Sequence, residues 1–356
     1  MPERGVSSGL IRRFETAGDD GFCRRNSPGS SAAMPNHSDS RAGLEASAVV
    51  RRVFALGFLL VAAMFGWFAT GDLPPLGGEP DLVWGKRGVR DGDLARPRAA
   101  TIDGNDRLWI VDFTARIQAY DLDGRHLGIT FTPPDYRNGR PSGLGTDCQG
   151  RLMVADSHYH CVRIYDEGRE VQRLGGRPGT EPGEFGYISD VVQDSEGFFY
   201  LSEFGQNDRI TQLDSSGRFV RSWGMMGQGP GEFNRVRALA IGPDGLLYAA
   251  DACNHRIQVF TRQGRFVRSF GRVGSGPGEL QYPYDLCFGP GGELYVAERG
   301  NHRIQKFRSD GESLGTWGRP GNHPGELADP WAVVVDRFGR VHVVDTENHR
   351  VQRVTF

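Results

Sequence analysis

The sequence has little lysine and almost no excess charge of either sign. Lys86 and Lys306 are the only lysines among 42 basic residues, which we interpret as compositional bias. The formal net charge is −2 and the pI is about 6.5. This balance excludes the bulk basic field with which many proteins hold nucleic acid, and the sequence has no acidic tail.

Common catalytic motifs are also missing. The 356 residues contain no phosphate-binding loop and no zincin motif. The 5 cysteines form no CxxC pair. We expect mostly buried free thiols, with a disulfide as the alternative.

The sequence has a single long hydrophobic run. Every residue from Val53 to Ala69 is apolar or glycine. At 1.5 Å per residue, this run spans roughly 25 Å, near the short end for a membrane helix. Arg51 and Arg52 precede it and Asp72 follows, so the positive-inside rule places the N-terminus in the cytoplasm. We therefore expect residues 48–71 to anchor the chain in a membrane.

The alternative for the same run is a cleaved secretory signal, with the small residues Ala69 and Gly71 before the cut. Residues 1–47 have a disordered composition without apolar rhythm, and residues 72–80 read as a linker. Under either reading, residues 81–356 lie outside the cytoplasm.

A repeat occupies this exported part. DACNHRIQVF (251–260) recurs as ERGNHRIQKF (298–307) and DTENHRVQRV (345–354), each 47 positions on. Within residues 237–271, turn signals separate four runs with strand-favouring residues: RALAI, LLYAAD, HRIQVF and RFVRSFG. Four strands per unit at a period of 44 to 49 residues indicate a β-propeller.

The number of blades follows from the first strands, which begin near Arg98, Ser142, Ser189, Arg237, Tyr284 and Trp331. The sixth unit ends at Phe356 without a fourth strand, whereas residues 81–84 form a strand-like run without a unit. Pairing of the two would close the ring and leave no long edge exposed. We predict an all-β, six-bladed propeller of four-stranded antiparallel blades over residues 81–356.

The motifs G-x-G-P-G-E-F, L-Y-x-A-D, N-H-R-I-Q-x-F and G-x-F-x-x-x-W-G resemble those of NHL repeats. The resemblance implies a six-bladed propeller, here of the bacterial membrane-anchored or exported type. NHL propellers include RNA-binding modules, protein-interaction platforms, sensor domains outside bacterial membranes and the amidating lyase domain of peptide-hormone processing. The fold therefore does not choose the function.

Residues that recur in every unit are expected to be structural, because a catalytic centre is needed once. An acid ends the second strand and an arginine opens the third, where the two can form parallel hydrogen bonds. The predicted pairs are Asp112–Arg116, Glu203–Arg209, Asp251–Arg256, Glu298–Arg303 and Asp345–Arg350. In the second unit, Cys161 takes the place of the arginine.

Residues that vary between units are the better candidates for function. The first-strand starts and the loops between second and third strands meet on one face, around the mouth of the central channel. The candidate binding residues on this face are Arg98, Tyr187, Asp190, Arg237, Tyr284, Asp285, Trp331, His158, Tyr159 and His160.

The sequence offers two candidate metal sites. On a strand, His158 and His160 would point the same way and could supply two zinc ligands, but no third ligand is evident. Asp190 and Asp285 could hold calcium near the axis, as in propeller lactonases, but too few further oxygen ligands can be placed. We assign no cofactor.

The expected function is binding of a protein or small-molecule ligand by an extracytoplasmic propeller tethered through residues 53–69. The alternative is a metal-assisted propeller lyase or hydrolase. RNA binding through the arginines is disfavoured by the hydrophobic segment. The sequence identifies neither the ligand nor the oligomeric state.

Overall fold

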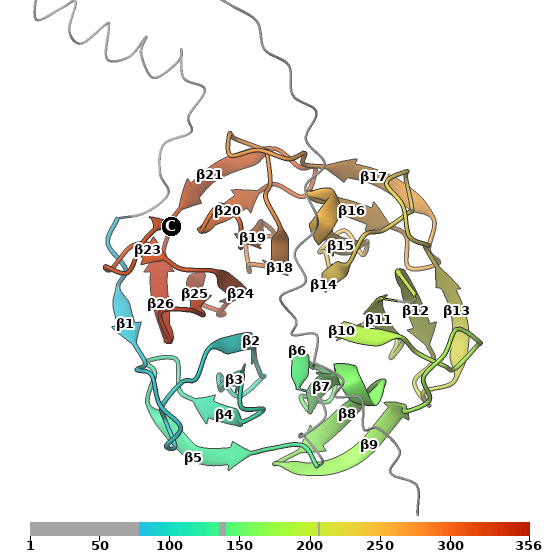
Figure 1. Cartoon of the computed structure of the whole chain (residues 1–356), viewed down its shortest axis with the longest axis horizontal. Coiled ribbons are helices and arrows are strands. Elements are labelled where there is room, and N and C mark those ends of the chain that lie inside the picture. Colours follow the sequence, from blue (N-terminus) through green and yellow to red (C-terminus); the bar gives the residue numbers. More distant parts are fainter. Residues whose placement is uncertain (1–77, 135–139, 206) are drawn as a thin grey trace, which may run out of the picture. The chain divides into compact units, whose positions relative to one another are not determined.

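The computed structural model describes residues 78–134, 140–205 and 207–356. Six four-stranded antiparallel sheets surround a central axis, with the first strand of each innermost (Figure 1). The predicted six-bladed propeller is confirmed.

The first three blades are built in chain order from strands of four to seven residues. Blade 1 contains β2 (Pro97–Ile102), β3 (Leu108–Asp112), β4 (Ile117–Tyr120) and β5 (His126–Phe131). Blade 2 contains β6 (Pro141–Thr146), β7 (Leu152–Asp156), β8 (Cys161–Asp166) and β9 (Arg169–Gly175). Blade 3 contains β10 (Tyr187–Gln193), β11 (Phe199–Phe204), β12 (Arg209–Leu213) and β13 (Phe219–Trp223).

The next two blades repeat this order, and the last takes its outer strand from the beginning of the chain. Blade 4 contains β14 (Val236–Ile241), β15 (Leu247–Asp251), β16 (Arg256–Phe260) and β17 (Phe266–Phe270). Blade 5 contains β18 (Pro283–Phe288), β19 (Leu294–Glu298), β20 (Arg303–Phe307) and β21 (Ser313–Trp317). Blade 6 contains β24 (Pro330–Val335), β25 (Arg340–Asp345), β26 (Arg350–Thr355) and β1 (Leu82–Trp84).

Strand β1 closes the ring as predicted. It pairs antiparallel with β26, with Trp84 opposite Val351. The Trp84 ring lies 4.7 Å from that of Tyr120 in blade 1 and packs against a core cluster shared by blades 6 and 1. The closing strand therefore contributes to the interface between the last blade and the first.

The linkers that enter blades 1, 3, 4, 5 and 6 are each held by the arginine that opens the third strand of that blade. In blade 4, Arg256 donates from Nε to Asp251 Oδ2 at 2.8 Å and from its terminal nitrogens to the carbonyls of Gln228, Gly229 and Glu232. In the linker before blade 6, β22 (Arg319–Pro320) pairs in parallel with β23 (Glu326–Leu327). A repeated linker thus needs a repeated arginine.

All five predicted acid–arginine pairs are in contact. Their N···O distances are 2.6 Å for Asp112–Arg116, 3.1 Å for Glu203–Arg209, 2.8 Å for Asp251–Arg256, 2.6 Å for Glu298–Arg303 and 2.7 Å for Asp345–Arg350. In blade 2, Asp156 pairs instead with Arg163, two residues after Cys161, at 2.7 Å. Arg163 stands where most other blades carry glutamine, an exchange that the sequence analysis missed.

The predicted membrane segment, residues 53–69, lies outside the described residues. Within the described ranges, no helix is both long enough and apolar enough to cross a membrane. Cys161 is a buried free thiol and Cys287 a half-buried one, whereas the free thiol of Cys148 is exposed, against expectation.

Candidate functional site

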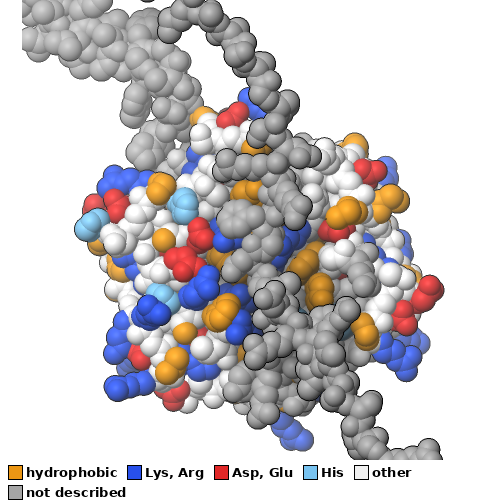
Figure 2. Space-filling view, viewed as in Figure 1, with side chains coloured by type: hydrophobic (Ala, Val, Ile, Leu, Met, Phe, Trp, Pro, Cys, Tyr) orange, Lys and Arg blue, Asp and Glu red, His pale blue; other side chains and the backbone are white. Residues whose placement is uncertain are grey.

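The first-strand starts and the loops between second and third strands lie on one face of the ring. In blade 1, Pro97 at the start of β2 stands opposite Asp112 at the end of β3, and the other blades keep this register. We call the axial end of this face the channel mouth. In Figure 2, lysine and arginine side chains lie around the middle of the face in view, among acidic and hydrophobic ones.

A group of arginines and aromatic rings from four blades occupies the channel mouth. Arg98, Arg237 and Arg299 place their guanidinium carbons 4.9, 5.5 and 5.6 Å from the centre of the Trp331 ring. The Tyr284 ring meets Trp331 edge-on at 5.4 Å. We call these five residues the mouth cluster. Each contact is a cation–π or aromatic pair in an environment from which most water is excluded.

Arg299 was not among the predicted site residues. Its Nη1 donates to the Tyr284 hydroxyl at 3.0 Å, and its Nη2 pairs with Asp329 at 3.0 Å. A sequence signal exists, because Arg299 directly follows the repeated acid Glu298, and the residue at that position differs in most blades.

Phe113 follows the repeated acid of blade 1 and was missed in the same way. Its ring lies 3.6 Å from the Arg140 guanidinium and 4.6 Å from that of Arg98. The cationic and aromatic surface thus continues from the mouth cluster over blade 1.

The blade 2 loop adopts a geometry different from the one assumed for it. Ser157–Tyr159 form a short 3-10 helix, η2, and His160 follows in the left-handed region with φ of 53°. The idea that His158 and His160 point the same way along a strand was therefore wrong. Both rings instead lie 5.5 Å from the Tyr187 ring, and His160 Nδ1 is 2.8 Å from the Gly186 carbonyl oxygen. Tyr159 is separate, with its ring 5.6 Å from the Arg163 guanidinium.

Below the mouth cluster, Asp190 and Asp285 line the channel. Asp190 Oδ2 accepts a hydrogen bond from Leu239 N at 2.8 Å, and Asp285 Oδ2 accepts one from Val333 N at 2.9 Å. Each carboxylate therefore bridges its own blade to the first strand of the next. The glycine at position 143 is required beside them, because a Cβ there would lie 2.7 Å from Asp190 Oδ1 and 2.5 Å from the Ser189 carbonyl oxygen.

The protonation of these two acids is perturbed. Burial raises the pKa of Asp190 to about 7, against the effects of its backbone hydrogen bonds and of Arg237. Burial and the neighbouring Asp190 carboxylate raise the pKa of Asp285 well above its ordinary value. Two nearby carboxyl groups in a low dielectric resist carrying two charges at once.

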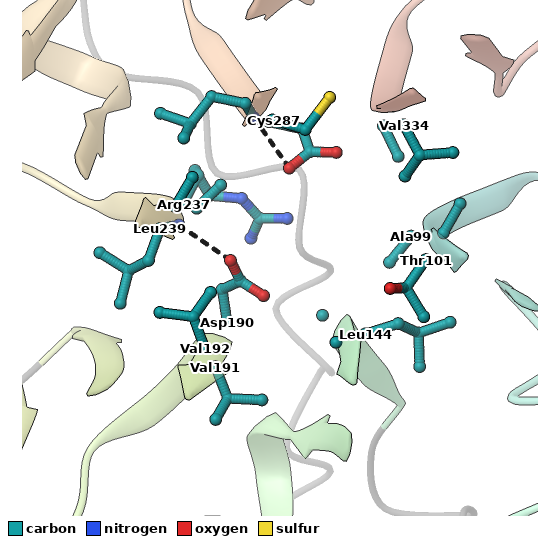
Figure 3. Close-up of a pocket in the computed structure, with 18 of the residues that line it drawn as sticks. Ala99, Thr101, Leu144, Asp190, Val191, Val192, Arg237, Leu239, Cys287 and Val334 are labelled. Carbon is teal, nitrogen blue, oxygen red and sulfur yellow. Dashed lines mark hydrogen bonds between the residues drawn. The ribbon is translucent and has the colours of Figure 1, made fainter. Parts of the chain in front are cut away.

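The channel around these residues encloses a cavity of about 350 Å³. The innermost strands of all six blades line it, and Asp190 and Arg237 point into it from neighbouring blades (Figure 3). Deeper in, the lining includes Thr101, Val192, Cys287 and Val334. Across the described ranges, no group of three or more His, Cys, Asp or Glu side chains is arranged to hold a metal ion.

Apart from Tyr159, which lies beside Arg163, the predicted site residues fall into two groups. Arg98, Asp190, Arg237, Tyr284, Asp285 and Trp331 converge on the channel mouth and its cavity. His158, His160 and Tyr187 form a separate aromatic contact between blades 2 and 3.

Comparison with known families and proteins supports the repeat assignment. The model of the NHL repeat matches residues 233–260 and 280–307. The rat peptidylglycine alpha-amidating monooxygenase is 35% identical over 136 residues, which cover 34% of this chain and 13% of the rat protein. The mouse NHL repeat-containing protein 3 is 29% identical over 140 residues, which cover 35% of this chain and 40% of that protein. The chain thus matches less than half the length of either relative.

Solved propellers share the architecture at low sequence identity. A gluconolactonase from Xanthomonas campestris has a TM-score of 0.58 at 16% identity, with 79% of this chain and 96% of that chain covered. Virginiamycin B lyase from Staphylococcus aureus, in a structure with quinupristin, has a TM-score of 0.53 at 17% identity, with 74% and 81% covered. These similarities concern the fold alone. The chain contains NHL repeats at residues 233–260 and 280–307 and folds as a six-bladed β-propeller, a fold that supports a binding or scaffold module.

Proposed function

We propose that this protein is an extracytoplasmic propeller, tethered to a membrane, that binds a ligand or a protein at its channel mouth without catalysing a reaction. The observation that carries the proposal is the mouth cluster. Four different blades contribute to it, and none of its residue types recurs around the whole ring. Its composition therefore does not follow from the needs of the repeat.

The chemistry of the mouth cluster suits recognition. Guanidinium groups lying against aromatic rings present both fixed positive charge and flat apolar surface. Trp331 is 4% exposed and Arg98 is 5% exposed. Tryptophan, tyrosine and arginine in nearly dry positions are the residue types that contribute most to binding energy at interfaces.

The binding proposal is tested with the full chain and two aromatic truncations. The purified protein is immobilised and exposed to extracts of its source organism, and the retained molecules are identified by mass spectrometry. Trp331→Ala should lower retention of the specific ligand about tenfold or more, as loss of a central anchor does. Phe338→Ala should leave retention unchanged, because Phe338 is 61% exposed in a turn at the opposite end of β24. Equal retention by the Trp331→Ala variant would overturn the proposal.

The location rests on residues 48–71, with their apolar run and flanking charges. A reporter active only after export is fused behind Phe356, and the same fusion is made in a chain lacking residues 48–71. We expect activity from the first fusion alone, in the membrane fraction. Activity that does not depend on residues 48–71 would contradict the tether.

A second candidate function is a metal-assisted lyase or hydrolase, and the Asp190–Asp285 pair favours it. Perturbed acids in a cavity are typical of catalytic sites. Elemental analysis of purified protein for zinc and calcium separates the two functions. A stoichiometric metal that is lost in Asp285→Asn but retained in His158→Ala would move the assignment to the enzyme.

A further inference from the structure

Arg237 has unusual surroundings for a buried arginine. It is 5% exposed, and within the described part of the chain its Nε has no hydrogen-bond partner. Whereas Arg299 pairs with Asp329, Arg237 enters no ion pair among the described residues. Its guanidinium carbon lies 4.8 Å from the Tyr284 ring, and the group points into the channel cavity (Figure 3). An arginine always carries its charge, so open donors in a buried position favour an anionic partner.

The charge around Arg237 limits which anion fits. Asp190 and Asp285 line the same cavity, and Oδ2 of each accepts a hydrogen bond from a backbone N–H of the next blade. Asp285 Oδ1 also accepts one from Leu286 N at 2.9 Å. A phosphate dianion would face these two acids as well as the arginines Arg237 and Arg98. A monoanion meets less repulsion, particularly while one of the two acids is protonated. The remaining carboxylate lone pairs can accept hydrogen bonds from a donor on the same ligand.

The cavity volume limits the size of the ligand. About 350 Å³ is near the lower end of the roughly 300–1,000 Å³ typical of small-molecule sites. The deeper lining includes the apolar side chains of Val192, Val334 and Leu144, with Thr101 beside them. A small molecule with one anionic group, one polar donor and an apolar remainder matches this distribution.

Building on the proposed function, we propose that the channel cavity binds a small organic acid whose carboxylate pairs with Arg237 and whose hydroxyl or amino group donates to Asp190 and Asp285. The proposal gives Arg237, Asp190 and Asp285 each a partner on the ligand.

The test measures binding of defined probes to the full chain by calorimetry at constant ionic strength. The probes are lactate, mandelate and phenylalanine, each compared with its amide, and phenylacetate, which matches mandelate without the hydroxyl. We expect at least one acid to bind and its amide to bind about tenfold or more weakly, because the amide cannot pair with the guanidinium. Binding of none of the acids, or equal binding of acid and amide, would overturn the proposal.

Variants assign the contacts. Arg237→Gln should weaken the acid about tenfold or more, and Arg237→Lys should weaken it less because the charge is kept. Asp190→Asn should reduce the preference for mandelate over phenylacetate. Arg337→Gln is the control for loss of an arginine, because Arg337 is exposed in the turn before β25. Circular dichroism and thermal unfolding confirm that each variant is folded.

The outcomes separate this inference from the proposed function. A ligand that is lost in Trp331→Ala but bound equally by wild type and Arg237→Gln would overturn the organic-acid site while leaving a binding function at the channel mouth. An acid that needs Arg237 but binds equally well to wild type, Asp190→Asn and Asp285→Asn would refute the two-contact arrangement. An acid that needs both contacts supports the inference.

Discussion

His349 Nδ1 accepts a hydrogen bond from the backbone N–H of Arg96 at 2.9 Å, although 253 positions separate the two residues. The contact joins the last blade to the first. His255 accepts from Tyr282 N, and His302 from Asp329 N, each at 3.1 Å. The histidine of each Asn-His-Arg triplet therefore links its blade to the next.

Loss of the closing contact should destabilise the ring. His349→Ala leaves the Arg96 N–H without this acceptor, and we expect a loss of roughly 1 kcal/mol in the free energy of unfolding. Urea unfolding measures this value. The exposed His323 supplies the control, since His323→Ala removes no side-chain contact of this kind. Equal effects of the two substitutions would contradict the assigned role.

The same histidines should make stability depend on pH. Burial lowers the pKa values of His255 and His349 below the ordinary 6.5. Their Nδ1 atoms must also stay unprotonated to accept the backbone hydrogen bonds from Tyr282 and Arg96. Just below pH 6.5 the unfolded chain therefore binds more protons than the folded protein. The stabilisation that these histidines contribute is present above pH 6.5 and is lost as the pH falls below it. A His255→Asn, His349→Asn variant should lose less Tm than wild type between pH 7.5 and about 5. Parallel curves of Tm against pH for the variant and wild type would count against the prediction.

Asp190 should have the opposite dependence. Its pKa in the folded protein is raised to about 7 from an ordinary 3.8, so the folded state favours the protonated acid. The stabilisation that protonated Asp190 contributes is fully present below pH 3.8 and is lost as the pH rises through 7. Asp190→Asn stays neutral throughout, so its Tm relative to wild type should increase between pH 4 and 8, as measured by calorimetry. A difference that is constant with pH would show that Asp190 does not titrate in this way.

The stability of blade 2 should depend on Arg163 as strongly as that of the other blades depends on the arginine that opens their third strand. The side chains of Arg163 and Asp156 are 3% and 2% exposed. Arg163→Leu should cost about 3–5 kcal/mol in the free energy of unfolding, because it leaves a buried carboxylate without its partner. Arg173→Leu removes a half-exposed partner of Glu170 and should change stability by roughly 0.5 kcal/mol or less. Chemical denaturation measures both values, and comparable losses of stability in Arg163→Leu and Arg173→Leu would refute the larger role assigned to Arg163.

The closing strand should contribute through its tryptophan. Trp84 is half-buried against Tyr120 at the junction of blades 6 and 1. Trp84→Ala should cost about 2–4 kcal/mol, whereas Trp84→Phe keeps an aromatic ring in place and should cost less than about 1.5 kcal/mol. Thermal unfolding of both variants checks the order. An Ala variant as stable as wild type would mean that ring closure does not need this contact.

Some features of the candidate site were accessible from sequence and others were not. Arg237 and Trp331 were predicted because they stand at the start of a first strand, a position of the repeat at which the residue varies between blades. Arg299 and Phe113 occupy another variable position of the repeat, directly after the acid that ends the second strand, and the sequence-based prediction did not include it. The geometry of His158 and His160 was misjudged because a tight turn, η2, replaces the expected continuation of a strand.

The sequence by itself determined the number of blades, the turn positions and the closure by residues 82–84, because each depends on a period and on local turn chemistry. The tertiary structure alone decided which variable residues meet. Asp190, Arg237 and Asp285 lie 47 and 48 positions apart and belong to three separate sheets. They share one cavity because the innermost strands of a closed ring converge on its axis. The direction of each side chain there depends on packing across blades, which a one-dimensional period does not encode.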